Sequence, residues 1–454
     1  MTRLIPITIA FLLGVLTGWA LGASPQSELR ACVNHAATLP VQTASFTRFI
    51  SFYNLPAEDR AAAERVLSYV LNAVSRTARI TAPSRLPGSE CVVIDLRAYG
   101  IPVEVWESIL DGEPYWHLTT EVLDPTTGKK KKVLTDAGHL DLAEAKQLRE
   151  TTGSGGAIVR ADWLTVKLTQ PPHYNNFAGV PATLADWYKS LGVDRDVVIA
   201  LRANKGANII TSGVTKKPRR ISRYQGALGG VWQTYDSFGT DPLKDPIRNP
   251  TFSAGFDAGE FIATKPNGLH LFALFDAQGK RQDSVPDRIA KDDSELHGDG
   301  VLAPAVSCIR CHIEDGLRPF TNDQKSLDLS GVKIIADASQ PQDDLAAFYG
   351  LDGSGKLERQ LTRDREDYAA AVAQATGGMK SKDLAEAFAK VFRSYEFDLV
   401  DPDSAKRELG TDTLEPLKGT GDVYLLALAN GKPIPRRAFE ASYSVAALAV
   451  KGTP

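Results

Sequence analysis

The sequence Cys-Ile-Arg-Cys-His at residues 308–312 constrains this chain more than any other feature. It gathers three side chains that bind metals and cofactors into one short stretch. The whole chain has four Cys and seven His in 454 residues, so chance seldom produces this cluster. If the stretch is helical, Cys308 and Cys311 lie one turn apart on the same side. The fold must therefore present two thiols and an imidazole side by side.

This C-x-x-C-H pattern is the attachment signature of c-type haem. Two thiols three residues apart reach the two vinyl groups of one porphyrin edge, and His312 then ligates the iron. A zinc site is a rival interpretation, but it needs four N or S ligands, and no second pattern of this kind supplies them. A redox dithiol is another rival, but no strand–helix–strand pattern surrounds the motif. We expect one haem c, attached through Cys308 and Cys311.

An apolar segment near the N-terminus predicts export. Residues 4–23 follow Arg3, contain no charge and end in Ala20-Leu21-Gly22. A basic start, an apolar middle and a small-residue end are the layout of a signal peptide. An uncleaved anchor is the alternative, because about twenty apolar residues just span a bilayer. In both cases we expect residues 1–23 to direct the body of the protein out of the cytoplasm, to the periplasm.

The other two cysteines, Cys32 and Cys91, form the second pair. In an oxidising compartment an even remainder of cysteines indicates a disulfide. The alternative is two buried, unlinked thiols. We expect a Cys32–Cys91 disulfide.

The second axial ligand of the iron has several candidates. Met379 becomes the only methionine once Met1 is removed with the signal, and it lies in a glycine-containing stretch between two expected helices. Methionine and histidine are the usual sixth ligands of haem c. His297 precedes the motif by eleven residues. His270 fits better as a strand residue against a core, and an iron with no sixth protein ligand is a further possibility.

Residue patterns predict a mixed fold. Helices are expected at residues 56–78, 103–110, 140–149, 184–191, 357–375 and 384–395, where apolar residues recur with helical spacing. Strands are expected at residues 91–96, 116–123, 129–134, 157–169, 259–264 and 269–275. The basic stretch at residues 209–223 is expected to be a surface loop, with contact to haem propionates as the alternative.

At the Cys308–His312 motif the chain resembles monohaem c-type cytochromes. Upstream, Arg160-Ala161-Asp162-Trp163 and the Trp232–Asp236 stretch are similar to larger exported bacterial cytochromes of unassigned function. The resemblance implies haem attachment outside the cytoplasm. It also implies an α+β domain of unknown role at residues 24–255, followed by a mostly α-helical, haem-bearing cytochrome c-like domain at residues 256–454.

Composition limits the partners. A net charge of −3 lacks the basic surplus of a dedicated nucleic-acid binder. No later segment approaches the length of an apolar span, so we expect no membrane contact beyond the N-terminal segment. We therefore expect an exported electron carrier that meets redox partner proteins, rather than a catalyst. The alternatives are a peroxidase-like haem enzyme and a redox- or ligand-sensing binding module with an open iron.

Overall fold

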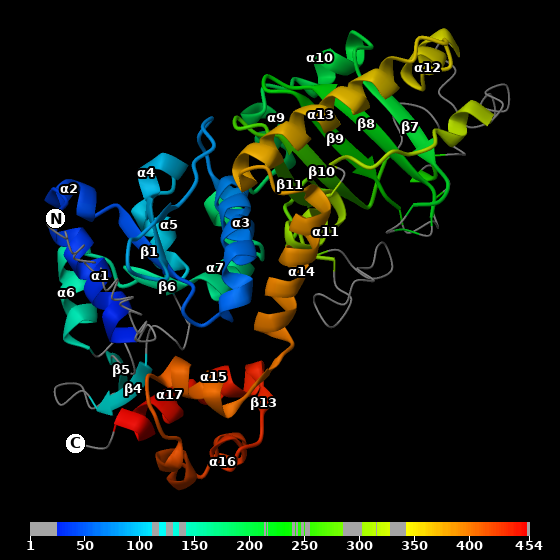
Figure 1. Ribbon diagram of the computed structural model, residues 1–454. Helices are drawn as coiled ribbons and strands as arrows, with labels where there is room; N and C mark the ends of the chain where they lie inside the picture. Colours follow the sequence, from blue (N-terminus) through cyan, green and yellow to red (C-terminus); the bar gives the residue numbers. More distant parts are fainter. Residues whose placement is uncertain are drawn as a thin grey trace, which may run out of the picture.

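Figure 1 shows the computed structural model of the chain. The described residues are 25–110, 118–123, 130–135, 142–212, 215, 217–237, 241, 244–246, 249, 255–284, 302–314, 316–326 and 342–451. The expected signal segment, residues 1–23, lies outside them, as does His297. No helix within the described ranges is long and apolar enough to cross a membrane.

A four-stranded sheet organises the N-terminal part, with strand order β2-β3-β1-β6. Strand β1 runs antiparallel to β3 and parallel to β6. The strands of this sheet are β1 (Thr47–Ser51), β2 (Ser84–Arg85), β3 (Cys91–Asp95) and β6 (Ile158–Arg160). Around it lie α1 (Pro25–Ala37), α2 (Val41–Ala44), α3 (Ala57–Val74), α4 (Leu96–Tyr99), α5 (Val103–Ser108), α6 (Ala143–Thr152), α7 (Ala161–Leu168) and α8 (His173–Ala178). The predicted hairpin is present as β4 (Leu118–Leu123) and β5 (Lys130–Thr135).

The strand predicted at residues 157–169 is largely wrong. Only Ile158–Arg160 is extended, as β6, and the chain then turns into α7. Seven of the eight α7 residues are buried, so no polar face marks a helical period. A short, fully buried helix cannot be told from a strand by periodicity alone.

A five-stranded antiparallel sheet forms the second part, with order β11-β10-β9-β8-β7. Its strands are β7 (Lys205–Ile209), β8 (Arg219–Gln225), β9 (Gly230–Tyr235), β10 (Ala258–Thr264) and β11 (His270–Asp276). Helices α9 (Leu184–Ser190) and α10 (Arg195–Ala200) precede it. Successive side chains along a strand point to opposite faces, so the sheet has two distinct surfaces.

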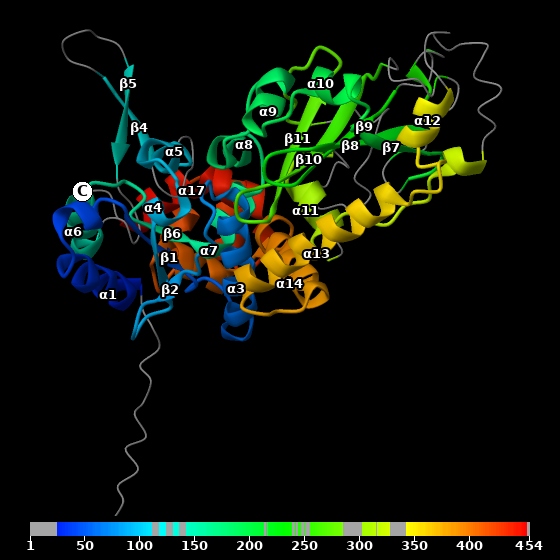
Figure 2. The same cartoon turned by 90° about the horizontal axis from the view of Figure 1, so that it is seen from above.

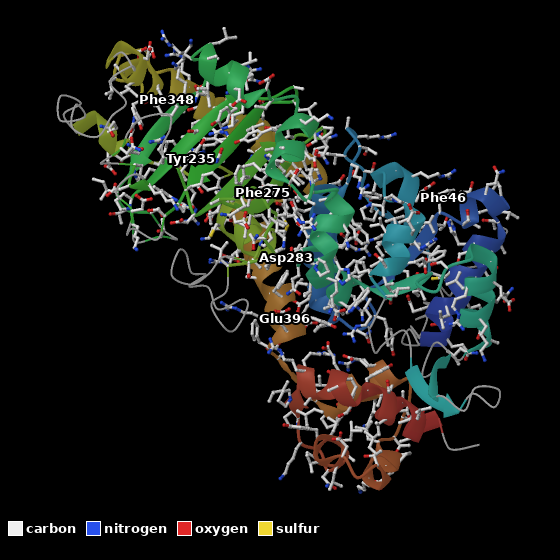
Figure 3. The ribbon with its side chains drawn as sticks, turned by 180° about the vertical axis from the view of Figure 1, so that it is seen from behind. Phe46, Tyr235, Phe275, Asp283, Phe348 and Glu396 are labelled. Carbon is white, nitrogen blue, oxygen red and sulfur yellow. The ribbon has the colours of Figure 1, made fainter. Side chains whose placement is uncertain are left out.

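One face of the five-stranded sheet packs on aromatic side chains of α9. Figure 3 looks onto this face, where Tyr235 and Phe275 are labelled. Phe275 packs edge-on against Trp187 of α9, with ring centroids 5.8 Å apart. We call the opposite face the pocket face. It carries Arg219, Ile221, Trp232, Thr234, Glu260 and Ile262.

Helix α13 (Lys356–Thr376) lies across the pocket face, as Figures 1 and 2 show. A buried ion pair fixes it there. Arg223 donates to both oxygens of Asp364 at 2.8 and 3.0 Å, and the indole N–H of Trp232 donates to the same carboxylate at 2.8 Å. Because all three side chains are buried, this contact specifies how α13 sits on the sheet.

The expected fold class is wrong. The α+β portion does not end at residue 255 with a mostly helical cytochrome domain after it. Strands β10 and β11 lie after residue 255 but belong to the same sheet as β7, β8 and β9, with Phe261 opposite Gln233. A two-stranded hairpin is marginal by itself, whereas pairing with β9 covers an open strand edge. The C-x-x-C-H motif at residues 308–312 therefore comes after the last strand of a large antiparallel sheet in the chain.

The remaining elements are mostly helical. They are α11 (Val306–His312), η3 (Asp323–Ser326), α12 (Gln342–Phe348), α14 (Ser381–Glu396), α15 (Pro402–Leu409), η5 (Glu415–Gly419), α16 (Val423–Ala429) and α17 (Arg436–Lys451), with the short strand pair β12 (Leu399–Val400) and β13 (Ile434–Pro435). Helices α15, α16 and α17 lie below the two sheets in Figure 1, whereas α12 lies at the far end of the five-stranded sheet. Buried Glu408 accepts hydrogen bonds from Arg436 at 2.7 and 2.8 Å and pairs with Arg160 at 2.7 Å. This ion network joins the C-terminal helices to the N-terminal part.

Candidate functional site

Helix α11 carries the whole C-x-x-C-H motif. Its Val306 and Ile309 are buried in the main core, which anchors the helix. Cys308 and Cys311 are half-buried, and neither forms a disulfide in the structure. Their spacing of three residues brings both to one side of the helix, and both line the same pocket.

His312 is held by a backbone carbonyl. Its Nδ1 lies 2.7 Å from the oxygen of Gly316, so Nδ1 carries the hydrogen and Nε2 is the nitrogen that could bind a metal. Burial is the main cause that lowers the pKa of His312 to about 4; the contact with the Gly316 carbonyl opposes this shift, and the charges of Arg318 and Arg219 add to it. The imidazole is therefore neutral, as iron ligation requires.

A pocket of about 900 Å³ lies between α11 and the pocket face of the sheet. This volume falls within the range of about 300–1,000 Å³ that small-molecule and cofactor sites occupy. Cys308, Cys311 and His312 all line it. Its apolar lining consists of Ile209, Ile210, Ile221, Trp232, Ile262, Leu302, Leu317, Pro319, Phe320 and Leu361. The motif and a largely apolar wall thus meet across one cavity.

The pocket also holds a cluster of charges on the sheet, in which Arg219 and Asp236 are buried and Glu260 is half-buried. Arg219 of β8 donates to both oxygens of Asp236, each at 2.7 Å. Glu260 of β10 lies 3.2 Å from the same guanidinium. Arg219 and Glu260 line the pocket directly. This places an acidic and a basic group in the cavity that contains His312.

Two further arginines line the pocket near the motif. Arg310 lies within α11, and Arg318 donates from Nε to the carbonyl of Cys311 at 2.9 Å. Cations at the edge of an apolar cavity suit the propionate carboxylates of a haem.

The basic stretch at residues 209–223 differs from the surface loop that was expected. Arg219, Arg220 and Arg223 are buried on β8. Arg219 and Arg223 pair with carboxylates, while Arg220 donates to the carbonyl of Asn249 at 2.9 Å. Of these three, Arg219 lines the pocket.

The structure does not bring Met379 into this pocket. Met379 is half-buried between α13 and α14 and packs against the main apolar core. His270 is buried on β11, stacked on Tyr368 with ring centroids 3.9 Å apart, which confirms its prediction as a strand residue against the core. Among the described lining residues, His312 is the sole histidine and none is a methionine.

Cys32 and Cys91 lie together in a separate closed core. Both are fully buried free thiols, one on α1 and one on β3. The Cys91 thiol donates to Glu28 at 3.2 Å. A hydrogen bond with Cys32 and then burial raise the pKa of Cys91 well above its ordinary value. The disulfide is not formed in the structure, but the two thiols are neighbours, so the pairing stays a prediction.

The residues present fit a haem c. The lining supplies two thiols for attachment, one neutral imidazole nitrogen, apolar walls and cations for carboxylates. The described residues contain no group of three or more His, Cys, Asp or Glu that would hold a metal ion, so they supply no zinc site around the motif. Sequence reasoning missed Glu260 as a pocket residue, and it considered Trp232 only as part of an aromatic stretch that could contact haem propionates. The charge of Glu260 inside the apolar strand GEFIAT was the available signal.

Comparison with known proteins adds no assignment. No family model, no curated protein and no solved structure matches the chain. The function must therefore be argued from the pocket itself.

Proposed function

We propose that this protein is an exported monohaem c-type cytochrome that carries electrons in the periplasm. Cys308 and Cys311 attach the haem, and His312 ligates the iron. One observation carries the proposal: all three residues line a single pocket of about 900 Å³, and the 2.7 Å contact of His312 with Gly316 leaves Nε2 as the ligand atom.

The chain's own residues have distinct roles in this proposal. Cys308 and Cys311 would hold the haem through thioether bonds, each formed by adding a thiol S–H across one vinyl group, which needs no oxidant. The carbonyl of Gly316 orients His312 and fixes its tautomer. Trp232, Ile221 and Ile262 form an apolar wall that excludes water. The bound haem would supply one-electron chemistry, and the protein would tune its potential through burial and charge. Redox partner proteins are the proposed partners.

The test is a pyridine haemochrome spectrum of the purified protein, produced in a host that matures c-type cytochromes. We expect one covalently bound haem per chain. Cys308→Ala with Cys311→Ala should abolish covalent haem, because no thiol is left to form a thioether. The matched control is Cys32→Ala with Cys91→Ala, which removes the other pair and should retain the haem. A wild-type protein without covalent haem would refute the proposal.

A second candidate is a haem enzyme or ligand sensor with an open iron. The observation that favours it is the pocket lining, which offers no methionine and no second histidine among the described residues. Carbon monoxide separates the two candidates. Fast, tight binding to the ferrous protein supports the open iron, and absence of binding supports a six-coordinate electron carrier.

A further inference from the structure

We propose that reduction of the haem in this pocket is coupled to the uptake of one proton by Glu260. The inference rests on the proposed haem attachment and extends it. It would make the protein a carrier of an electron together with a proton. It depends on the arrangement of Arg219, Asp236 and Glu260 on the pocket face.

The cluster contains two carboxylates and one guanidinium. Arg219 makes its two-pronged contact with Asp236, at 2.7 Å for each bond, and Thr234 donates to the same carboxylate at 2.8 Å. Two parallel N–H···O bonds are the strongest form of this pairing. Asp236 is thereby neutralised, and Glu260 supplies the surplus negative charge.

The carboxylate of Glu260 has fewer hydrogen-bond partners than that of Asp236. Its Oε1 lies 3.2 Å from the Arg219 guanidinium, but in a geometry that makes no hydrogen bond, and it has no other partner among the described residues. Burial, and then the nearby charge of Asp236, raise the pKa of Glu260 against the opposing effect of Arg219. The Glu260 side chain is 17% exposed and lines the pocket, so solvent can supply a proton to its unsatisfied oxygen.

The cluster lies within electrostatic reach of the proposed iron ligand. Glu260 and His312 line the same cavity, and the charge of Arg219 acts on the His312 imidazole. Charges interact over longer distances in a buried cavity than in water, since less solvent screens them. A change of charge at the iron would therefore change the pKa of Glu260.

Other groups facing this cavity carry charge as well. Arg310 and Arg318 approach from α11 and the segment after it, and Asp323 approaches from η3. The neighbour of Glu260 on β11 is Leu274, which is uncharged. On the sheet, Arg219 and Asp236 are thus the charged neighbours that the described strands bring to Glu260.

The coupling has a definite sign. The oxidised iron centre carries one more positive charge than the reduced centre, so it favours ionised Glu260. In the haem-loaded protein, a one-electron reductant would supply the electron that reduces the iron. The carboxylate of Glu260 then takes a proton from solvent and becomes a carboxylic acid. Between the pKa values of the two redox states, the midpoint potential must fall as pH rises.

The test is a potentiometric titration of the haem-loaded protein at pH values from 5 to 9. A tenfold change in proton concentration shifts a fully coupled one-electron potential by about 59 mV. We expect the wild type to approach this slope over part of the range. Glu260→Gln, which keeps the shape but cannot ionise, should reduce the slope at least by half. Glu358→Gln is the matched control, because it removes an exposed carboxylate beside an adjoining cavity and should leave the slope unchanged.

Two results would overturn the inference. One is a wild-type potential that does not depend on pH. The other is a slope that persists in Glu260→Gln, which would assign the proton to another group such as a propionate. If Glu260→Gln fails to fold, Glu260→Asp keeps an ionisable group but moves it, so it should shift the pH range of the slope, and an unshifted range would overturn the inference. Protein that lacks covalent haem would overturn the proposed function as well, and the haemochrome spectrum recognises that case.

Discussion

The two cysteine pairs of this protein differ in their spacing along the chain, their burial and their surroundings. Cys308 and Cys311 lie one helical turn apart, half-buried, at the wall of a cavity. Cys32 and Cys91 come from a helix and a strand 59 positions apart and are sealed in a core. The first pair is accessible from the pocket, whereas each thiol of the second pair has the other thiol as a neighbour. Location, rather than the thiol itself, decides the chemistry.

The largest difference should appear in thiol reactivity. In haem-free, reduced protein, we expect iodoacetamide to modify Cys308 and Cys311 more than about 100-fold faster than Cys91, because the thiolate is the nucleophile and the raised pKa of Cys91 suppresses it. Peptide mass spectrometry over time measures the rates. Labelling in denaturant is the control and should make the rates equal. Equal alkylation rates in the folded protein would show that burial does not protect Cys91 relative to Cys308 and Cys311.

A disulfide between Cys32 and Cys91 should raise the free energy of unfolding. If Cys32 and Cys91 are linked in the exported protein, the bridge closes a loop of about 60 residues and stabilises the fold by roughly 4 kcal/mol. Urea unfolding with and without reductant measures this difference. A variant with Cys32→Ser and Cys91→Ser should not respond to reductant. An unchanged unfolding curve in the wild type would show that the pair stays as thiols.

The turn at Gly316 orients His312, the residue next to Cys311, because the Gly316 carbonyl contacts the imidazole. Gly316 has a φ of +65°, and a Cβ there would meet the Tyr368 ring at 3.0 Å. We expect Gly316→Ala to cost about 2 kcal/mol in the free energy of unfolding. Gly350→Ala is the control, with a φ of +67° and no atom within 4 Å, so it tests backbone strain alone. If both variants lose the same stability, the contact with Tyr368 contributes nothing.

The smallest effect is expected at Met379. Because this residue packs against the core and does not line the pocket, Met379→Ala should leave the visible spectrum of the haem protein unchanged. The methionine-to-iron charge-transfer band is the signal to monitor. A band present in the wild type and lost in the variant would show that Met379 ligates the iron after all.

Local signals in the sequence predicted much of the fold. Helices α3, α13 and α14 and the β10–β11 hairpin carry strong periodicity or a turn signal, and all are present. The attachment motif is also local, so Cys308, Cys311 and His312 were found together. The short buried helix α7 was missed because its burial on all sides removes any periodic pattern.

The wall of the pocket could not be predicted in this way. Arg219, Trp232 and Glu260 reach the motif only through strand pairing in a sheet, and they lie 52 or more positions before His312 in the chain. The resemblance to cytochromes also predicted a mostly helical domain at residues 256–454, because it extended a local motif to a whole domain. Strands β10 and β11 of the sheet lie in that range. Long-range pairing is set by tertiary packing, which a single sequence does not display.

The central claim is that one haem is bonded covalently to Cys308 and Cys311. The most direct measurement is the intact mass of the denatured protein, combined with alkylation of its free thiols. We predict a mass gain of one haem, with Cys308 and Cys311 resistant to alkylation. A mass equal to the polypeptide alone, with both of these cysteines alkylated, would contradict the account.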